Sequence, residues 1–162
     1  MVVILEGVNR TGKTTFADYL KKYHDAVIIK DTSIHTVDIP EEYKRYYSAG
    51  GISGITLTLE CIGAFCSRDL YVLDRFHLTE LVYGIIDRCY RFAEFEEYDA
   101  RLAKLGARLI LMHDDPVNVS SRAGKDMARY CAQMDRAYDM SSIQKVKGNF
   151  DNMGALLQWL AS

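Results

Sequence analysis

Short apolar runs alternate along the chain with longer segments whose apolar residues recur every three or four positions. Runs of this kind are typical of strands buried on both faces of a parallel sheet. We predict five strands, at Val2–Leu5, Ala26–Ile29, Leu70–Asp74, Arg108–Met112 and Ile143–Val146. The alternation predicts an α/β protein in which helical crossovers join parallel strands.

The segments between the runs have helical spacing. We predict helices at Gly12–Tyr23, Pro40–Gly50, Ser53–Ser67, His77–Ile86, Cys89–Leu105, Asp126–Met140 and Asp151–Leu160. A further short helix should start at Pro116, with Asp115 as its cap. The segment Ser53–Ser67 also contains a strand-like alternation of Ile55, Leu57 and Leu59 with threonines, but its helical pattern is longer.

The first predicted strand leads directly into a glycine-rich segment. Residues 7–14 read GVNRTGKT and fit G-x-x-x-x-G-K-[ST], the phosphate-binding loop. Its two glycines let the backbone approach a phosphate closely, while the following helix contributes N–H groups and a positive dipole end. Lys13 can reach the outer phosphates of ATP, and the Thr14 hydroxyl can bind Mg²⁺. We expect the nucleotide to contact Gly7, Asn9, Arg10, Thr11, Gly12, Lys13, Thr14 and Thr15.

Strand, glycine loop and helix in this order predict the P-loop NTPase fold, a three-layer α/β/α arrangement around a parallel sheet of about five strands. We expect one domain over residues 1–162, with a short mobile lid around residues 118–130. In such sheets, ligands bind at the carboxyl ends of the strands. The glycine loop, Asp31, Asp74-Arg75 and His113-Asp114 all follow predicted strands, so we expect them at one edge.

Asp74 and Arg75 end the third predicted strand. A carboxylate beside the glycine loop can hold Mg²⁺, although an aspartate here can also simply cap the next helix. An arginine at this position suits bidentate contact with a phosphate, and the alternative is a surface ion pair.

Three further residues are weaker candidates for catalysis. Asp31 can accept a proton from a substrate hydroxyl or serve only as a turn residue, and we leave these alternatives open. Arg122 and Arg129 belong to a basic cluster with Lys125 and Arg136, which is either a lid over the phosphates or a solvated helix face. We favour the lid for Arg122 and Arg129 only.

Composition narrows the class of partner. The 162 residues are 49% hydrophobic and 26% charged, with a formal net charge of -2, so a large DNA footprint is disfavoured. No apolar run reaches the length of a membrane span, and we expect no signal peptide. The four cysteines lack metal-binding spacing, which favours reduced thiols in a cytoplasmic protein. The sequence is compatible with a homodimer as well as with a monomer.

Particular residues resemble the thymidylate kinase and deoxynucleoside kinase group. They are Ile4-Leu5-Glu6-Gly7, the loop up to Thr15, and Leu73-Asp74-Arg75-Phe76 with Tyr83 following. The run from Asp74 to Gly84 is similar to small thymidylate-kinase-like proteins common in phages. The resemblance covers the first half of the chain well and the last third weakly.

The resemblance implies a kinase that uses ATP and Mg²⁺. Lys13 and Thr14 would serve the ATP phosphates and the metal, Asp74 the metal, and Arg75 the acceptor phosphate. Arg10 matches an arginine that bridges donor and acceptor phosphates in some thymidylate kinases. The stretch Lys30-Asp31-Thr32-Ser33 stands where the group usually has Pro-Gly-Gly.

Several functions are consistent with these residues. The leading hypothesis is transfer of the ATP γ-phosphoryl group to a (deoxy)nucleoside monophosphate. The alternatives are a deoxynucleoside kinase, with Asp31 as base, and a phage-type kinase of hydroxymethylated bases in DNA. A nucleotide switch or ATPase is the non-kinase alternative, although the chain has no guanine-recognition motif and no Asp-x-x-Gly after Asp74.

Overall fold

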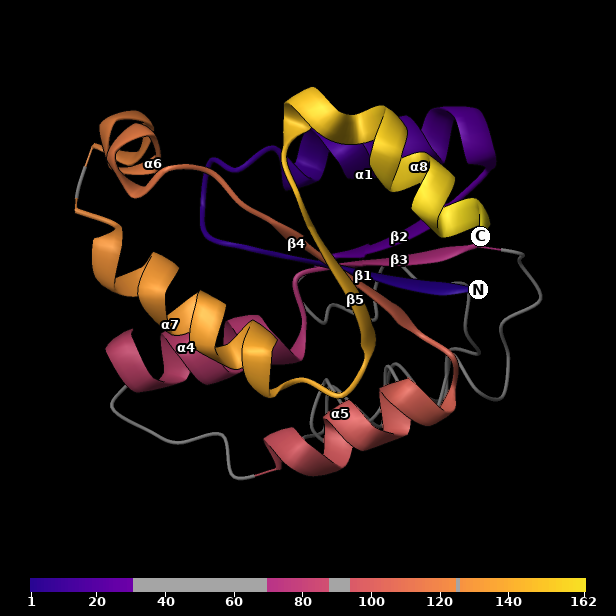
Figure 1. Ribbon diagram of the computed structural model, residues 1–162, viewed down its shortest axis with the longest axis horizontal. Coiled ribbons are helices and arrows are strands. Elements are labelled where there is room, and N and C mark those ends of the chain that lie inside the picture. Colours follow the sequence, from indigo (N-terminus) through magenta and orange to yellow (C-terminus); the bar gives the residue numbers. More distant parts are fainter. Residues whose placement is uncertain (31–69, 88–93, 125) are drawn as a thin grey trace, which may run out of the picture.

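Five parallel strands form the centre of the molecule in the order β2-β3-β1-β4-β5 (Figure 1). The computed structural model describes residues 1–30, 70–87, 94–124 and 126–162. The strands are β1 (Val2–Glu6), β2 (Val27–Lys30), β3 (Tyr71–Asp74), β4 (Arg108–Met112) and β5 (Gln144–Gly148). The predicted sheet of about five parallel strands is therefore confirmed.

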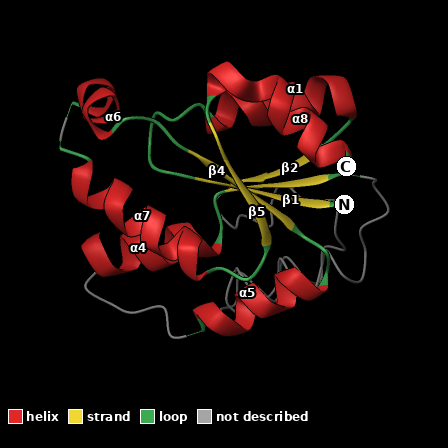
Figure 2. Cartoon of the chain, viewed as in Figure 1, coloured by secondary structure: helices red, strands yellow, loops and turns green. Residues whose placement is uncertain are grey.

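Helices cover both faces of the sheet, as Figure 2 shows. They are α1 (Lys13–His24), α4 (His77–Asp87), α5 (Phe95–Lys104), α6 (Pro116–Ala123), α7 (Ala128–Met140) and α8 (Met153–Ala161), the last preceded by a 3₁₀ turn, η2 (Phe150–Asn152). Helices α1 and α8 lie on one face, and α4, α5 and α7 lie on the other. The predicted three-layer α/β/α class is confirmed.

Each face has its own buried apolar cluster. One cluster joins the strands to α1 and α8 through residues such as Phe16 and Leu156, which are almost fully buried. The other joins the strands to α4, α5 and α7 through residues such as Leu78, Leu102 and Met134. These two layers fix the strands, and with them the loops at the carboxyl edge. No helix in the described parts of the chain is long and apolar enough to cross a membrane.

Strand β1 is the central strand and carries the glycine loop. Its neighbours are β3 on one side and β4 on the other, in a register that pairs Leu5 with Asp74 and Glu6 with Leu111. All three strands run in the same direction, so the segments that follow Glu6, Asp74 and Met112 leave the sheet at one edge.

Some predicted boundaries are wrong. Of the helix predicted at Cys89–Leu105, residues 89–93 lie outside the described residues, Glu94 lies in a turn, and α5 covers Phe95–Lys104. The helix predicted from Asp126 begins at Ala128, because the Asp126 carboxylate accepts a hydrogen bond from the Ala128 amide at 2.9 Å. Strand β5 extends beyond its predicted end to Gly148, and the first turn of the predicted last helix is the 3₁₀ turn η2.

Other predicted features agree with the structure or lie outside it. Strand β4 has its predicted ends, and Asp115 caps α6 with Pro116 at its first position, as predicted. The helices predicted at Pro40–Gly50 and Ser53–Ser67, and the candidate base Asp31, lie outside the described residues.

Candidate nucleotide-binding site

The glycine loop follows β1 at the carboxyl edge and depends on its two glycines. Gly7 has φ +135°, and a Cβ there would lie 2.3 Å from the carbonyl oxygen of Met112 at the end of β4. Gly12 has φ +88° and immediately precedes α1. Only glycine adopts such angles at low cost, so the loop can lie against β4 and turn into the helix. Arg10, at the tip, also has a positive φ, of 69°.

The lysine of the motif lies inside this loop. The Lys13 ammonium donates a hydrogen bond to the Val8 carbonyl oxygen at 2.6 Å, and it lies 3.4 Å from the Thr11 hydroxyl. The Thr11 hydroxyl in turn donates to the same carbonyl oxygen at 3.0 Å. Lys13 and Thr11 are buried, whereas Thr14 and Thr15 are exposed at the first turn of α1. The loop therefore holds the Lys13 ammonium and the Thr11 hydroxyl against its own backbone, and it leaves Thr14 and Thr15 exposed.

A second functional segment, the turn Asp74–Phe76, lies beside the loop. Asp74 is buried at the end of β3, and Arg75 follows with φ 70°. The Arg75 amide donates to the Leu5 carbonyl oxygen at 2.9 Å, and its guanidinium Nη2 donates to the Asn9 side-chain oxygen. The structure thus brings together two segments, Asn9 and Arg75, that are 66 residues apart in the sequence.

A buried glutamate, Glu6, connects the same two segments. Its Oε1 accepts hydrogen bonds from the backbone amides of Phe76 at 2.9 Å, Leu78 at 3.0 Å and Thr79 at 3.4 Å. Its Oε2 accepts from the Thr79 hydroxyl at 2.6 Å. Burial raises the pKa of Glu6, while His77 and these hydrogen bonds oppose the rise. Glu6 therefore caps the first turn of α4 from the neighbouring strand.

Glu6 is among the residues that carry the resemblance, but no role was predicted for it. Its signal is a charged residue at the end of an otherwise apolar buried strand, directly before the first glycine of the loop. Buried carboxylates need hydrogen-bond donors, so such a residue indicates donors close by. Which donors it finds depends on β3 lying next to β1, and the hydrophobic pattern does not state that order.

Two hollows flank the loop and share Arg10, Gly12 and Thr15. One, of about 200 Å³, is lined by Arg10, Gly12, Lys13, Thr14, Thr15 and Arg75. The other, of about 340 Å³, is lined by the loop residues Arg10 to Gly12 with Thr15, by His113, Asp114 and Arg122, and by residues 149–151. Three residues with cationic side chains, Arg10, Lys13 and Arg75, thus line the first hollow together with Thr14. Arg10 stands between the two.

The second hollow is wider and has an aromatic wall. Phe150, in η2 after β5, is 51% exposed. Arg122, which lines the same hollow, lies in the last turn of α6 and forms an ion pair with Asp114. The hydrogen bond from Arg122 lowers the pKa of Asp114. An exposed aromatic ring and a guanidinium are both suited to stacking on a flat heterocycle.

Of the two predicted lid arginines, only Arg122 lines a hollow. Arg129 is exposed on the first turn of α7 and lines neither of the two. The predicted lid, residues 118–130, covers most of α6 and the start of α7.

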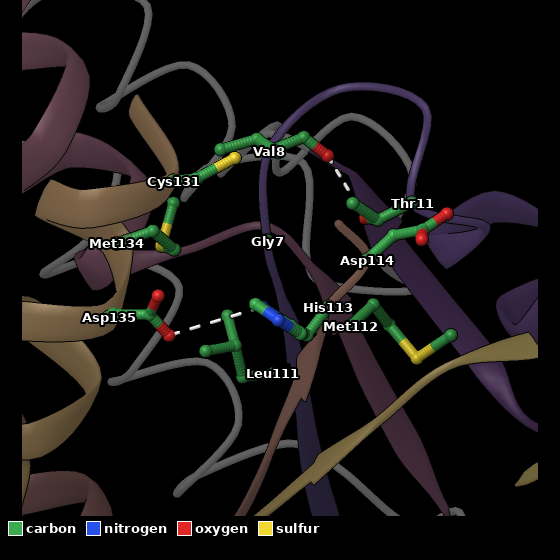
Figure 3. Close-up of a pocket in the computed structure, with 10 residues that line it drawn as sticks. All are labelled: Gly7, Val8, Thr11, Leu111, Met112, His113, Asp114, Cys131, Met134 and Asp135. Atoms are coloured by element: carbon green, nitrogen blue, oxygen red, sulfur yellow. Dashed lines mark hydrogen bonds and ion pairs between the residues drawn. The ribbon is translucent and has the colours of Figure 1, made fainter. Parts of the chain in front are cut away.

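A smaller pocket lies behind the loop, between it and α7, and Figure 3 shows its lining. Cys131 and Met134 of α7 lie near Gly7 and Val8, and the His113 side chain points toward Asp135, with 4.0 Å between Nδ1 and Oδ1. Burial raises the pKa of the Cys131 thiol. This pocket is mostly filled by side chains, and we assign it to packing of α7 against the loop.

His77 at the start of α4 belongs to a buried polar network. Its Nε2 lies 2.9 Å from Asp99 Oδ1 on α5. Asp99 also accepts hydrogen bonds from the Ser141 hydroxyl at 2.5 Å and from the Ser142 amide at 2.6 Å. The network ties α4 and α5 to the segment that leads into β5.

The residues for a metal are a hydroxyl and a carboxylate. Among the described residues, no group of three or more His, Cys, Asp or Glu side chains could hold a metal by itself. Thr14 and Asp74 offer the hard oxygen ligands that Mg²⁺ prefers, and Mg²⁺ usually completes its shell with water and phosphate oxygens. Thr14 lines the first hollow, whereas Asp74 lines neither hollow and is buried at the end of β3, next to the strand that leads into the loop; the chemistry of these two residues fits a magnesium ion that arrives with a nucleotide.

The sequence matches no protein-family model and no curated protein. The structure is similar to solved structures over nearly its whole length. They include the YorR protein from Bacillus subtilis in complex with phosphorylated GDP, with a TM-score of 0.66, 16% identity and coverage of 99% of this chain and 96% of that one. Thymidylate kinase from Ehrlichia chaffeensis has a TM-score of 0.56, 15% identity and coverage of 100% and 98%.

Deoxyadenosine kinase from M. mycoides with bound dATP has a TM-score of 0.55, 12% identity and full coverage of both chains. At these identities the likeness concerns the fold. The chain has the P-loop fold that thymidylate and deoxyadenosine kinases share.

Proposed function

We propose that this protein transfers the γ-phosphoryl group of ATP to a (deoxy)nucleoside monophosphate. The observation that carries the proposal is the position of Arg10 between two hollows, one lined also by Lys13 and Arg75 and the other by Arg122 and Phe150. A protein that only holds or hydrolyses a nucleotide needs one such hollow. A phosphotransferase needs two, with cations where they meet.

The wider hollow suits the donor. Phe150 and Arg122 are suited to stack on the adenine, and the loop backbone would lead the phosphates to Lys13 and Thr14, which line the smaller hollow. Thr14 and Asp74 would hold Mg²⁺, which would neutralise charge on the outer phosphates of ATP. Solved neighbours with the fold bind dATP and phosphorylated GDP, which supports the binding of a nucleotide by this chain.

The smaller hollow suits the outer phosphates of ATP together with the phosphate of the acceptor, because Arg10, Lys13, Thr14 and Arg75 line it. In the reaction, an acceptor phosphate oxygen forms a bond to the γ-phosphorus while the bond from that phosphorus to the β-phosphate oxygen breaks, and ADP leaves. Arg10, Lys13 and Arg75 would stabilise the charge on the transferring group. A phosphate nucleophile is already anionic at neutral pH, so this version requires no general base.

A panel of acceptors tests the proposal. ATP consumption with Mg²⁺ is measured against nucleosides, their monophosphates and DNA that carries hydroxymethylated bases. We expect a monophosphate to accelerate ATP turnover, and Lys13→Ala to remove the acceleration. Acceleration by a nucleoside or by modified DNA instead would identify a different acceptor for the same chemistry. If no acceptor accelerates turnover, the protein is a nucleotide switch or ATPase and the proposal is wrong.

Asp31→Asn separates the two small-molecule acceptors. A sugar hydroxyl needs a base, so with a nucleoside acceptor we expect kcat to fall about 10²-fold or more. With a monophosphate acceptor, kcat should stay near the wild-type value. The measurement is steady-state turnover at saturating ATP with the acceptor that the panel identifies. Near wild-type turnover on a nucleoside would exclude Asp31 as the base.

A further inference from the structure

We propose that Glu6 is a positioning residue for phosphoryl transfer, because it holds Arg75 over the hollow that contains Arg10 and Lys13. The inference rests on the proposed kinase function, and it concerns a residue that does not line either hollow. Glu6 acts through the turn Asp74–Phe76 rather than on the substrate.

The turn is fastened to β1 and its loop at three points. The Arg75 amide donates to Leu5 O at 2.9 Å, the Phe76 amide donates to Glu6 Oε1 at 2.9 Å, and the Arg75 guanidinium donates to Asn9. One contact is therefore with the strand backbone, one with the buried carboxylate and one with the loop. Residues of β1 and its loop contribute all three partners.

The conformation of Arg75 needs such support. Its φ of 70° lies in the left-handed region, which a residue with a Cβ adopts only where its surroundings enforce it. The residue after it, Phe76, precedes the first turn of α4 and has no polar side chain to cap that turn. Glu6 supplies the missing acceptor, to three amides and to the Thr79 hydroxyl.

The geometry makes the cap and the arginine one unit. Glu6 ends β1 and caps α4, and the next residue, Gly7, is the first residue of the phosphate loop. Shortening its side chain by one methylene withdraws the carboxylate from the amides. The turn then loses its hydrogen bond to Glu6, and Arg75 moves relative to Arg10 and Lys13. Displacements of about 1 Å in such groups cost about 10²-fold in rate.

The test is a double-mutant cycle between Glu6 and Arg75. Glu6→Asp should lower kcat by roughly 10- to 100-fold and leave KM for ATP within about twofold. In the Arg75→Ala background, the same change should have less than about a threefold effect, because the group that it displaces is gone. Glu6→Gln, which keeps a side-chain oxygen for the amides, should be milder than Glu6→Asp. Thr79→Val removes only the hydroxyl contact and should be milder still.

A matched control separates positioning from stability. Arg108 at the start of β4 donates to the Trp159 and Leu160 carbonyl oxygens and so caps the end of α8, away from the carboxyl edge. Arg108→Gln should lower the melting temperature with no coupling to Arg75. Equal losses of kcat from Glu6→Asp in both Arg75 backgrounds would overturn the inference, as would wild-type kcat in folded Glu6→Asp.

A second readout does not depend on catalysis. Calorimetry with inorganic tripolyphosphate measures the cationic hollow alone, and Glu6→Asp should weaken this binding only when Arg75 is present. If this coupling is found but the wild-type protein transfers phosphoryl to no acceptor, the proposed function is wrong and the positioning role stands. If the protein is a kinase but the coupling is absent, the positioning role is wrong and the function stands.

Discussion

At the residue scale, the proposed phosphoryl transfer gives Arg10 the central role. Arg10 lines both hollows, whereas Arg122 lines only the wider one. Arg10→Ala should therefore lower kcat by about 10²- to 10³-fold, because it removes charge where the phosphoryl group transfers. Arg122→Ala should mainly raise KM for ATP.

Steady-state kinetics with both substrates varied distinguishes these effects. Both side chains are exposed, so neither change should alter the melting temperature by more than a few degrees. A fall in kcat with Arg122→Ala as large as with Arg10→Ala would contradict the division into donor and transfer positions.

Gly7 is the residue on which the loop itself depends. Its φ of +135° is accessible essentially to glycine alone, and a Cβ would overlap the Met112 carbonyl oxygen at 2.3 Å. Gly7→Ala should destabilise the fold by roughly 2–5 kcal/mol, from backbone strain and overpacking together.

Gly106→Ala is the matched control for that substitution. Gly106 also has a positive φ, of 69°, but nothing lies within 4 Å of the Cβ position. Its cost should be only the left-handed strain of roughly 1–2 kcal/mol. Urea unfolding measures both. Equal costs would mean that the close approach to β4 contributes nothing.

At the element scale, the sequence predicts the interiors of elements better than their ends. Strand β4 has its predicted bounds because Gly106 precedes it and the polar pair His113-Asp114 follows it. The start of α7 depends on a local hydrogen bond from the Ala128 amide to Asp126, which apolar spacing does not reveal. Apolar periodicity indicates which side chains are buried. Side chains can stay buried in turns where the regular hydrogen bonding of a helix or strand has ended.

In the site, too, local features are predicted from the sequence and contacts between distant segments are not. The loop motif predicts the residues that surround Lys13, because the motif encodes a local backbone shape. The cap of α4 by Glu6 and the contact of Arg75 with Asn9 join segments about 70 residues apart. They depend on the strand order β2-β3-β1-β4-β5, and many orders are compatible with the same alternating pattern.

The network around Asp99 joins three elements and should make stability depend on pH. Burial acts to raise the pKa of Asp99, but hydrogen bonds from His77, Ser141 and Ser142 outweigh it and hold the pKa well below its usual range. A lowered folded-state pKa contributes stability that is complete above the unfolded value of about 4 and is lost progressively below it.

Asp99→Asn should therefore cost roughly 1–3 kcal/mol at pH 7, and the cost should shrink as the pH falls below about 4. Urea unfolding at several pH values measures both effects. Asp18→Asn, which changes an exposed carboxylate on α1, is the control and should change little at either pH. A cost for Asp99→Asn that is the same at pH 7 and pH 3 would show that the charge of Asp99 does not carry the network.

At the scale of the whole molecule, cationic side chains gather at one edge of a chain whose formal net charge is -2. Arg10, Lys13 and Arg75 come from two segments far apart in the sequence, and Arg122 comes from a third. Their mutual repulsion opposes folding at this edge, and an anionic ligand removes it. A polyphosphate should therefore stabilise the whole fold rather than the loop alone.

Ligand linkage gives this expectation a magnitude. ATP at a hundred times its dissociation constant should stabilise the protein by about 2.7 kcal/mol, since it binds a site that exists only in the folded chain. For a chain of this size that corresponds to a rise of roughly 5–10 °C in melting temperature. Differential scanning fluorimetry across ATP concentrations measures this rise in melting temperature. Salt should increase the dissociation constant of ATP, and the rise at a fixed ATP concentration should therefore be smaller at high ionic strength.

Lys13→Ala should remove most of the rise, because the buried ammonium faces the loop that would hold the phosphates. Arg108→Gln, at the opposite edge of the sheet, should lower the melting temperature of the free protein and keep the full ATP-dependent rise. An ATP-dependent rise that survives Lys13→Ala unchanged would place the nucleotide elsewhere on the molecule. The three segments at the carboxyl edge would then be a structural junction, and the two hollows would have no part in phosphate chemistry.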